Sequence, residues 1–253
     1  MRGLLGVVAM LAAAAAAAAW AGPEAAAEDE LRMVFTSTWS LPWGKLEGTR
    51  VSGGIQHDVA LAVARRLGWK LRYVLLPASK GDRSELDRHT DLHCGIDPSW
   101  TRRPEAYHWS EPLFDTSDLL IGHSDALPVR SLSELPNGSR VGAVGGYRYP
   151  TLEARFAAGQ LKRDDAPDQA RVLEKLTRKR TDYAVVSPQA LGWFLRHNPQ
   201  SLPAEWRVTV QQSAFYCAVP QSSPRDAAQI LDAVHALQRE GELARILASY
   251  SAR

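Results

Sequence analysis

Short apolar runs alternate with amphipathic stretches along most of this chain of 253 residues. The segment 31–36 is rich in strand-forming residues, and apolar side chains recur at helical spacing from Val59 to Leu67, after Gly53-Gly54. Further strand-like runs lie at 69–76, 91–96, 119–123, 140–144 and 182–186. Strands that alternate with helices predict an α/β fold, in which a mostly parallel sheet is flanked by helices.

The composition narrows the range of partners. The formal net charge is only +2 and no basic stripe is present, so nucleic acid is not an expected partner. Cys94 and Cys217 lie in no Cys-x-x-Cys pattern and near no histidine at ligand spacing, which gives little support to a metal site. Gly145-Gly146 lacks the longer glycine pattern of nucleotide-binding loops. We therefore expect no cofactor.

The N-terminus has the pattern of a secretory signal peptide. Residues 3–23 carry no charge and follow Arg2, and small residues offer cleavage sites after Ala21 or Ala27. The run is long enough to be an uncleaved membrane anchor instead, but much of it is weakly apolar alanine. We expect residues 1–27 to be removed and the mature chain to be periplasmic.

The stretch 101–114 combines two adjacent arginines with aromatic side chains and two prolines. Arginine presents a planar fork of donors that matches a carboxylate, so Arg103 is a candidate anion-binding residue. Trp100, Tyr107 and Trp109 could form the walls of such a site. The alternative is a solvated Arg102–Arg103 pair beside aromatic residues of the core.

This stretch resembles a segment of the periplasmic solute-binding proteins of the polar amino-acid-binding type, bacterial extracellular solute-binding protein family 3. Arg103 stands seven residues before Ser110, which is followed by Glu111-Pro112 as in the Ser-x-Pro of that family. Near the end, Gly241, Leu243, Ile246 and Tyr250 have the spacing of its closing helix. Trp100 replaces the threonine of the family, so the match is partial. The similarity runs from Leu31 to Tyr250.

The resemblance implies a two-lobe periplasmic binding protein fold. Each lobe would be a mostly parallel sheet flanked by helices, and two hinge strands near 119–126 and 208–218 would join the lobes. We expect lobe 1 to comprise 28–121 and 216–253, and lobe 2 to comprise 122–215. The segment 208–219 is expected to form a pair of strands returning to lobe 1.

The resemblance also implies candidate ligand-binding residues. Arg103 falls on the carboxylate-binding arginine, and Pro42-Trp43 matches a loop whose aromatic residue stacks on the ligand. Trp39 is the expected stacking residue, and Trp43 and Trp100 are further candidates for the walls. The alternative is that Trp39 and Trp43 only cover an edge of the core.

Three positions of lobe 2 depart from the pattern of amino-acid binders. Tyr147 and Arg148 replace a threonine or serine pair, and Ser187 replaces the aspartate that neutralises the ammonium of the ligand. An enclosed ammonium without a counter-charge is unfavourable. These departures favour a small organic acid without an amine, bound by Arg103 and Arg148. Alternatively, Arg148 points away and Asp182 or Asp97 supplies the missing charge, so that an amino-acid-like ligand fits.

No catalytic triad, carboxylate pair or metal-ligand cluster stands at a defensible spacing, so we do not expect an enzyme. The expected function is capture of a small carboxylate-bearing solute for an ABC-type membrane permease, by a monomer. The alternatives are a periplasmic sensor or accessory protein that docks another periplasmic protein, and a dehydratase or hydrolase on the same fold.

The resemblance places the runs around Cys94 and Cys217 on neighbouring strands of lobe 1. Since the signal peptide implies an oxidising compartment, a Cys94–Cys217 disulfide is expected. The alternative is two reduced, buried cysteines, because adjacent strands also need the right register.

Overall fold

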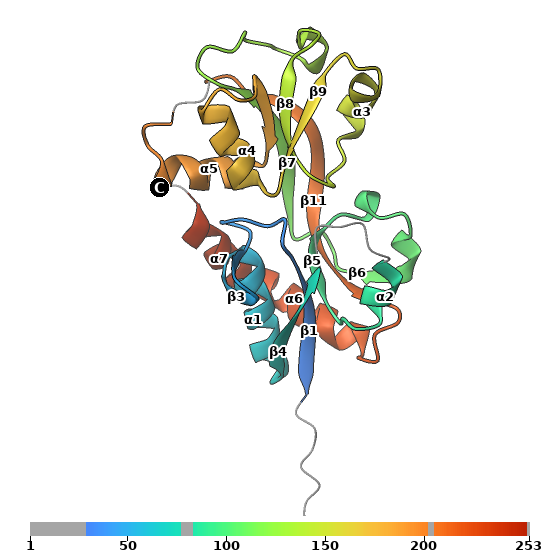
Figure 1. Ribbon diagram of the computed structural model, residues 1–253. Coiled ribbons are helices and arrows are strands. Elements are labelled where there is room, and N and C mark those ends of the chain that lie inside the picture. The colour runs from blue at the N-terminus through green and yellow to red at the C-terminus, as the bar shows by residue number, and fades with distance from the viewer. Residues whose placement is uncertain (1–28, 77–82, 202–204, 252–253) are drawn as a thin grey trace, which may run out of the picture.

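The computed structural model describes residues 29–76, 83–201 and 205–251. Figure 1 shows two lobes, one above the other, with the strands β7 and β11 running between them. The expected signal peptide lies outside the described residues. In the part of the chain that the structure describes, no helix is both long and apolar enough to cross a membrane.

The described strands form one seven-stranded sheet and two two-stranded sheets, and most neighbours in the larger sheet are distant in sequence. The strands are β1 (Glu30–Thr36), β2 (Lys45–Glu47), β3 (Arg50–Gly53), β4 (Lys70–Leu76), β5 (His93–Ile96), β6 (Tyr107–Trp109), β7 (Phe114–Gly122), β8 (Arg140–Val144), β9 (Lys162–Ala166), β10 (Tyr183–Val186) and β11 (Val208–Pro220).

Seven α-helices and three short 3-10 helices connect the described strands. The helices are α1 (Ile55–Leu67), α2 (Arg83–Asp87), α3 (Pro150–Ala157), α4 (Gln169–Thr177), α5 (Pro188–His197), α6 (Ala227–Arg239) and α7 (Glu242–Tyr250), with η1 (Pro98–Trp100), η2 (Pro104–Ala106) and η3 (Leu132–Glu134).

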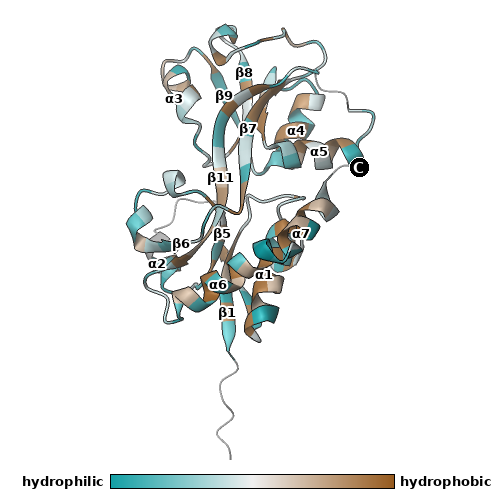
Figure 2. Cartoon of the chain, turned by 180° about the vertical axis from the view of Figure 1, so that it is seen from behind, coloured by the Kyte–Doolittle hydropathy of each residue, from teal (hydrophilic) through white to brown (hydrophobic). Residues whose placement is uncertain are grey.

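The lower lobe is built around β1, β4 and β5. Strand β1 pairs in parallel with β4, and Met33 forms a parallel bridge with Leu92 beside β5. Helix α1 ends at Gly68, whose left-handed backbone (φ 72°) favours glycine. The apolar faces of α1, α6 and α7 pack in one cluster with β1, so this core combines early and late segments of the described chain (Figure 2).

The upper lobe has a sheet covered on both faces. Strands β8 and β10 are parallel, as the sequence predicted for βα units, and β9, which the sequence did not predict, pairs in parallel with β8. Side chains alternate along each strand, so Val185 faces the cluster that includes α3, whereas Val186 faces the cluster that includes α4 and α5. This double coverage explains why all four residues of β10 are buried.

Two long antiparallel strands join the lobes. Phe114, at the start of β7, packs in the lower core, whereas Leu120 packs in the upper one. The chain thus passes between the lobes within β7. The expected strand pair at 208–219 is wrong. One continuous strand, β11, pairs first with β7 and then with β5 and β6, because neither glycine nor proline interrupts it before Pro220.

A disulfide joins Cys94 of β5 to Cys217 of β11, as predicted. The two residues are register partners in antiparallel strands, with Cα atoms 4.0 Å apart. Both cysteines are at least 97% buried in the lower core. The register that the sequence alone left open is therefore the one that permits the bond.

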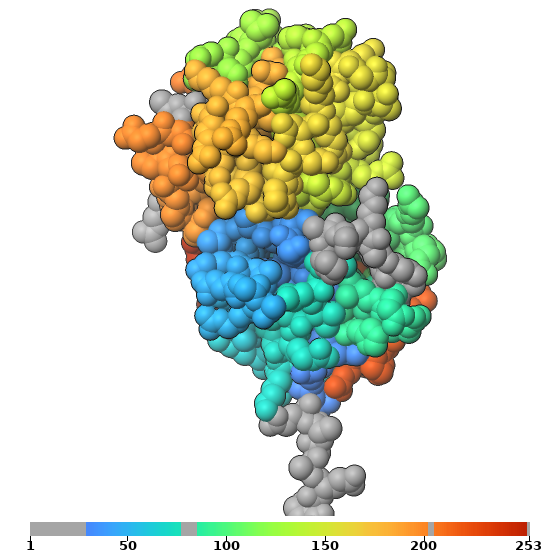
Figure 3. Space-filling view, viewed as in Figure 1, coloured from blue at the N-terminus to red at the C-terminus, as the bar shows by residue number. Residues whose placement is uncertain are grey.

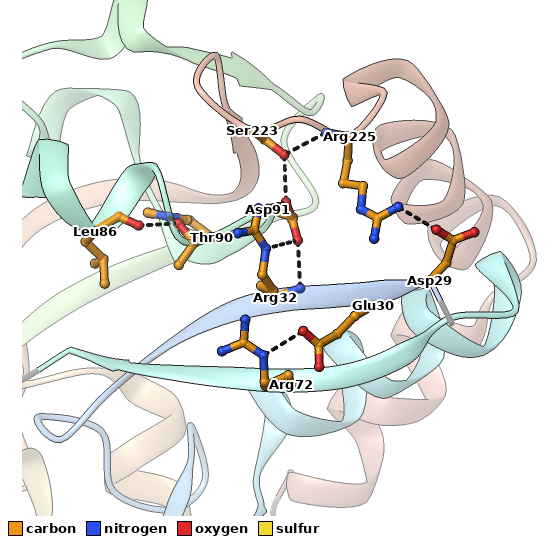
Figure 4. A network of polar contacts seen from close by, with 10 residues as sticks. Asp29, Glu30, Arg32, Arg72, Leu86, Thr90, Asp91, Ser223 and Arg225 are labelled. Carbon is orange, nitrogen blue, oxygen red and sulfur yellow. Dashed lines mark hydrogen bonds and ion pairs between the residues drawn. The ribbon is translucent and has the colours of Figure 1, made fainter. Parts of the chain in front are cut away.

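A polar network ties the edge of β1 to the C-terminal part of the chain (Figure 4). The guanidinium of Arg32 donates to both carboxylate oxygens of Asp91, at 2.8 and 2.6 Å, and Asp91 is fully buried. Ser223 donates to the same carboxylate at 2.7 Å. Burial raises the pKa of Asp91, but the hydrogen bonds from Arg32 and Ser223 outweigh it, and the net pKa is lowered.

Candidate functional site

The loop 37–44, between β1 and β2, presents two of the predicted tryptophans toward the upper lobe. Trp39 packs edge-on against Phe35, with ring centroids 5.0 Å apart. Trp43 is 8% exposed and stacks on Phe215 of β11 at 5.5 Å. Phe215 in turn stacks on Phe114 of β7 at 4.5 Å. The three stacked rings form an aromatic column where the hinge strands leave the lower lobe.

Trp43 also contacts the upper lobe directly. Its indole N–H donates to the Ser187 hydroxyl at 3.1 Å, although the two residues are 144 positions apart in sequence. Ser187 caps α5 by accepting from the Ala190 amide at 3.2 Å. Its own hydroxyl donates to Gln169 Oε1, which also accepts from the Ser187 amide. The structure thus brings together two predicted site residues, Trp43 and Ser187, and Ser187 is also the N-cap of α5.

Arg103 and Trp100 lie on the outer side of the segment after β5. Trp100 is 47% exposed, and the Arg103 side chain is 53% exposed. The Arg103 guanidinium stands 3.9 Å from the Asp87 carboxylate, beyond the roughly 2.7–2.9 Å of a charge-assisted hydrogen bond. Trp109 donates its indole N–H to the Pro104 carbonyl at 2.8 Å. Tyr107 of the same segment is buried and donates its hydroxyl to Asp87 at 2.9 Å, whereas Trp100, Arg102 and Arg103 are exposed.

Tyr147 and Arg148 follow β8. Tyr147 is half-buried and packs against both apolar clusters of the upper lobe, while Arg148 is exposed. The preceding Gly146 has φ 83°, a left-handed conformation that glycine adopts without strain. Among the contacts recorded for the described residues, none joins Arg148 or Arg103 to another predicted site residue.

The two carboxylates considered as substitutes for the missing aspartate are engaged elsewhere. Asp182 precedes β10, whereas Ser187 follows it, so the two stand at opposite ends of the strand. Asp182 accepts from the Arg140 amide at 2.7 Å. Asp97 accepts from the Ser99 and Ala214 amides at 2.9 and 3.0 Å. Asp182 is thus separated from Ser187 by the length of β10, and Asp97 is hydrogen-bonded to backbone amides.

Two grooves flank the aromatic column. The first, of about 520 Å³, runs along the hinge strands beside the start of α5 and is lined by Asp115, Thr116, Gln189 and Ser213 among others. The second, of about 510 Å³, separates the loop 37–46 from α4 and α5. Trp39, Lys45, Asp168, Glu174 and Trp193 line this second groove. Trp39 thus borders an open groove between the lobes, as a stacking residue would.

One acidic group near the hinge has a perturbed pKa. Asp118 of β7 accepts from the Gln211 amide of β11 at 2.7 Å. Burial raises the pKa of Asp118 to about 6, although the hydrogen bond from Gln211 lowers it. Burial, and then the charge of Asp118, raise the pKa of the neighbouring Tyr149 hydroxyl. Asp118 therefore changes charge in the weakly acidic range, within a strand that links the lobes.

Sequence reasoning missed Gln169, Phe215 and Asp118. Asp168-Gln169 carried a usable signal, since aspartate before a helical run is a typical N-cap and places the next side chain at the helix start. Phe215 and Asp118 gave none, because an apolar or acidic residue within a strand run does not reveal which element faces it. In the described residues, no group of three or more His, Cys, Asp or Glu side chains could hold a metal ion.

No protein-family model matches the chain, and no curated protein sequence matches it. Solved structures do. A histidine kinase sensor domain with similarity to periplasmic binding proteins aligns with a TM-score of 0.70 at 18% identity, covering 88% of this chain and 96% of that one. An amino-acid ABC transporter substrate-binding protein from Streptococcus pneumoniae, bound to L-arginine, aligns with 0.67 at 19%, covering 87% and 94%.

A third structure is an ancestral amino-acid-binding protein described as a precursor of cyclohexadienyl dehydratase. It aligns with a TM-score of 0.68 at 16% identity, covering 88% of this chain and 95% of that one. At such identities the likeness establishes the fold. The chain has the two-lobe α/β architecture of the periplasmic binding proteins, as the sequence predicted.

Proposed function

We propose that this protein is an exported solute-binding protein that captures a small carboxylate-bearing molecule between its lobes. The observation that carries the proposal is the convergence of Trp39, Trp43 and Ser187, from both lobes, beside two hinge strands. In such a fold, bending of the strands encloses a ligand. The captured molecule would pass to an ABC-type membrane permease, and the protein would act as a monomer in the periplasm.

The proposed division of the chain follows from the sequence. Residues 1–27 would be removed, 28–121 with 216–253 would form lobe 1, and 122–215 would form lobe 2. The packing of Phe114 and Leu120 in different cores supports a first crossing inside β7. The disulfide supports the expected oxidising compartment.

The proposed ligand is an acid without an amine. Arg103 would hold its carboxylate, Arg148 would add a second positive charge, and Trp39, Trp43, Trp100 and Tyr147 would supply aromatic surface. Ser187 is neutral, and the carboxylates of Asp97 and Asp182 accept hydrogen bonds from backbone amides. An ammonium enclosed beside Ser187 would then lack the counter-charge that an aspartate at this position would supply, which is unfavourable.

Mass spectrometry of small molecules released on denaturation tests the class of ligand. We expect a carboxylic acid without a primary amine in protein purified from its native compartment. Recovery of an α-amino acid at one equivalent would contradict the proposed class while leaving solute binding intact.

The role of Arg103 is tested by Arg103→Ala, with Arg102→Ala as the matched control. Loss of a charge-assisted contact should weaken binding of the released ligand by about 1.5 to 3 kcal/mol. Arg102 is the neighbouring exposed arginine, and its truncation should leave affinity within about 0.5 kcal/mol. Equal affinities of the two variants in calorimetry would reject Arg103 as the carboxylate-binding residue.

Two of the similar solved structures favour alternative functions. The sensor-domain neighbour favours a periplasmic sensor or accessory protein, which would bind the same ligand but dock another protein instead of a permease. The dehydratase-precursor neighbour keeps enzymatic turnover as a less favoured candidate. Incubating the protein with its released ligand separates an enzyme from the two binding functions. A product of changed mass indicates an enzyme, and unchanged ligand indicates a binding protein.

A further inference from the structure

Hydrogen bonds cross between the lobes at two places away from the hinge strands. One joins the loop 37–44 to the starts of α4 and α5, and the other joins the end of α5 to the end of α7. In Figure 3 the blue segment of the lower lobe lies directly against the yellow part of the upper lobe. The cleft is therefore bridged by side chains of the chain itself.

The central bridge is buried and fully satisfied. Trp43 and Ser187 are 8% and 5% exposed. A serine hydroxyl has one donor and two acceptor positions. In Ser187 the donor goes to Gln169, and the acceptors take the Trp43 indole N–H and the Ala190 amide. The bridge thus leaves no polar group for a ligand to satisfy.

A second bond reinforces the first. The Ala170 amide donates to the Ser40 hydroxyl at 3.2 Å. Ala170 is the second residue of α4, where a backbone amide has no partner within the helix. Its hydrogen bond exists only while the loop of the lower lobe lies against α4. The state of this single amide reports whether the lobes are together.

The peripheral contact lies on the same side of the hinge. Arg196 of α5 donates to the Tyr250 carbonyl at 3.2 Å, and the Trp193 ring lies 5.7 Å from the Tyr250 ring. The Tyr250 hydroxyl is itself held by Asp58 at 2.8 Å, so α7 is fixed to α1 at this point. The upper lobe thus contacts a rigid part of the lower one.

We propose that Trp43 is an intramolecular latch that holds the lobes closed without ligand. The indole N–H donates to Ser187 across the cleft, while its ring stays stacked on Phe215. Opening exposes the Ser187 cluster, the Ser40–Ala170 bond and the Arg196–Tyr250 contact to water, and leaves the aromatic column intact. The latch contains no charged group, so opening leaves no buried charge without its partner.

This inference requires the two-lobe hinge, but it requires no particular ligand. A molecule that enters through the open form has to compete with the latch. Its apparent affinity is the intrinsic affinity multiplied by the fraction of protein that is open. Closure without ligand would separate this protein from one whose lobes meet only around a bound solute.

Hydrogen exchange at the Ala170 amide tests the latch in ligand-free protein. Bound molecules are removed by unfolding in denaturant with the disulfide intact, followed by dialysis and refolding. Exchange is then followed by NMR in the wild type, Trp43→Phe and Ser187→Ala. Loss of one hydrogen bond should raise the open fraction, and so the exchange rate of Ala170, roughly two- to tenfold.

Trp69→Phe is the matched control. Trp69 lies in the lower lobe between α1 and β4, away from the cleft, with its ring 4.9 Å from the Arg225 guanidinium. In Trp69→Phe the Ala170 amide should exchange at the wild-type rate. Trp43→Phe keeps an aromatic ring on Phe215 and leaves the Ser187 N-cap of α5 in place. This variant therefore remains informative if Ser187→Ala unfolds α5.

Faster exchange in Trp43→Phe with an unchanged control supports the latch. An unchanged or slower rate in Trp43→Phe overturns it, and so does a wild-type Ala170 amide that exchanges as fast as an unstructured peptide. Because no ligand is present, these outcomes are independent of whether the proposed solute is correct.

Discussion

The lower lobe is assembled from two stretches of chain, whereas the upper lobe comes from one. Several long-range bonds of the lower lobe join its early stretch to its late one: Cys94 to Cys217, Asp91 to Ser223, Asp58 to Tyr250 and Asp29 to Arg225. In the upper lobe the bonds of Arg155, Arg163 and Tyr183 all end within the same continuous segment.

The difference follows from chain connectivity. The two stretches of the lower lobe are held near each other only by the upper lobe and its hinge strands, so closing them costs entropy that cross-links offset. The upper lobe closes shorter loops and is stabilised by apolar clusters on both faces of its sheet. The disulfide and several polar links therefore connect the two stretches of the discontinuous lobe.

Removal of the disulfide should give the largest effect. Cys94 and Cys217 are 123 positions apart, and in the chain-entropy model closing such a loop contributes about 4 to 5 kcal/mol. Cys94→Ala with Cys217→Ala should lower the free energy of unfolding by up to that amount, measured by urea denaturation. Tryptophan signals should show the lower lobe unfolding first. If both lobes of the variant unfold together at the wild-type urea concentration, the disulfide does not stabilise the lower lobe selectively.

Loss of the buried ion pair should be nearly as large. Asp91→Ala leaves the Arg32 guanidinium without its buried partner, and breaking such a pair costs about 3 to 5 kcal/mol. Glu30→Ala removes the exposed Arg72 pair and should cost less than about 1 kcal/mol. The pKa of Asp91 is lowered on folding, so its contribution is present above about pH 4 and is lost as the pH falls through the lowered value.

The smallest effect should be a change in the pH dependence of stability that comes from Asp118, in the hinge strand β7. The folded pKa of Asp118 is about 6, against 3.8 unfolded, so the folded state binds more protons between these values. Stability should fall as the pH rises from about 4 to about 6, by up to about 3 kcal/mol for a shift of two units. Asp118→Asn keeps an acceptor for Gln211 and should abolish this fall, as measured by denaturation at pH 4 and pH 8. A persistent fall would exclude Asp118 as its source.

Much of the fold was predictable because it depends on local patterns. The glycines around α1, the apolar run of β10 and the spacing of the closing helices all carry information within a few residues. Strand β9 was missed because Lys162-Arg-Asp-Asp165 has no apolar alternation, and its pairing with β8 along the sheet edge decides its conformation.

The site was less predictable because it depends on how two lobes meet. Trp43 and Trp39 were named from a local loop motif, but no pattern within the sequence indicates that the Trp43 indole reaches Ser187. Arg103 and Arg148 remain predictions, since their exposed side chains adopt positions that only a ligand or a neighbour would fix.

The position of the two cysteines also sets an order of events as the chain emerges, N-terminus first. Cys94 appears with no partner anywhere in the chain, and it stays a lone thiol until Cys217 follows 123 positions later. By then all of the upper lobe has emerged and can fold as one segment. Because the chain has no third cysteine, a single intramolecular pairing exists, and the disulfide can form only after every residue between the two cysteines, including the upper lobe, has emerged.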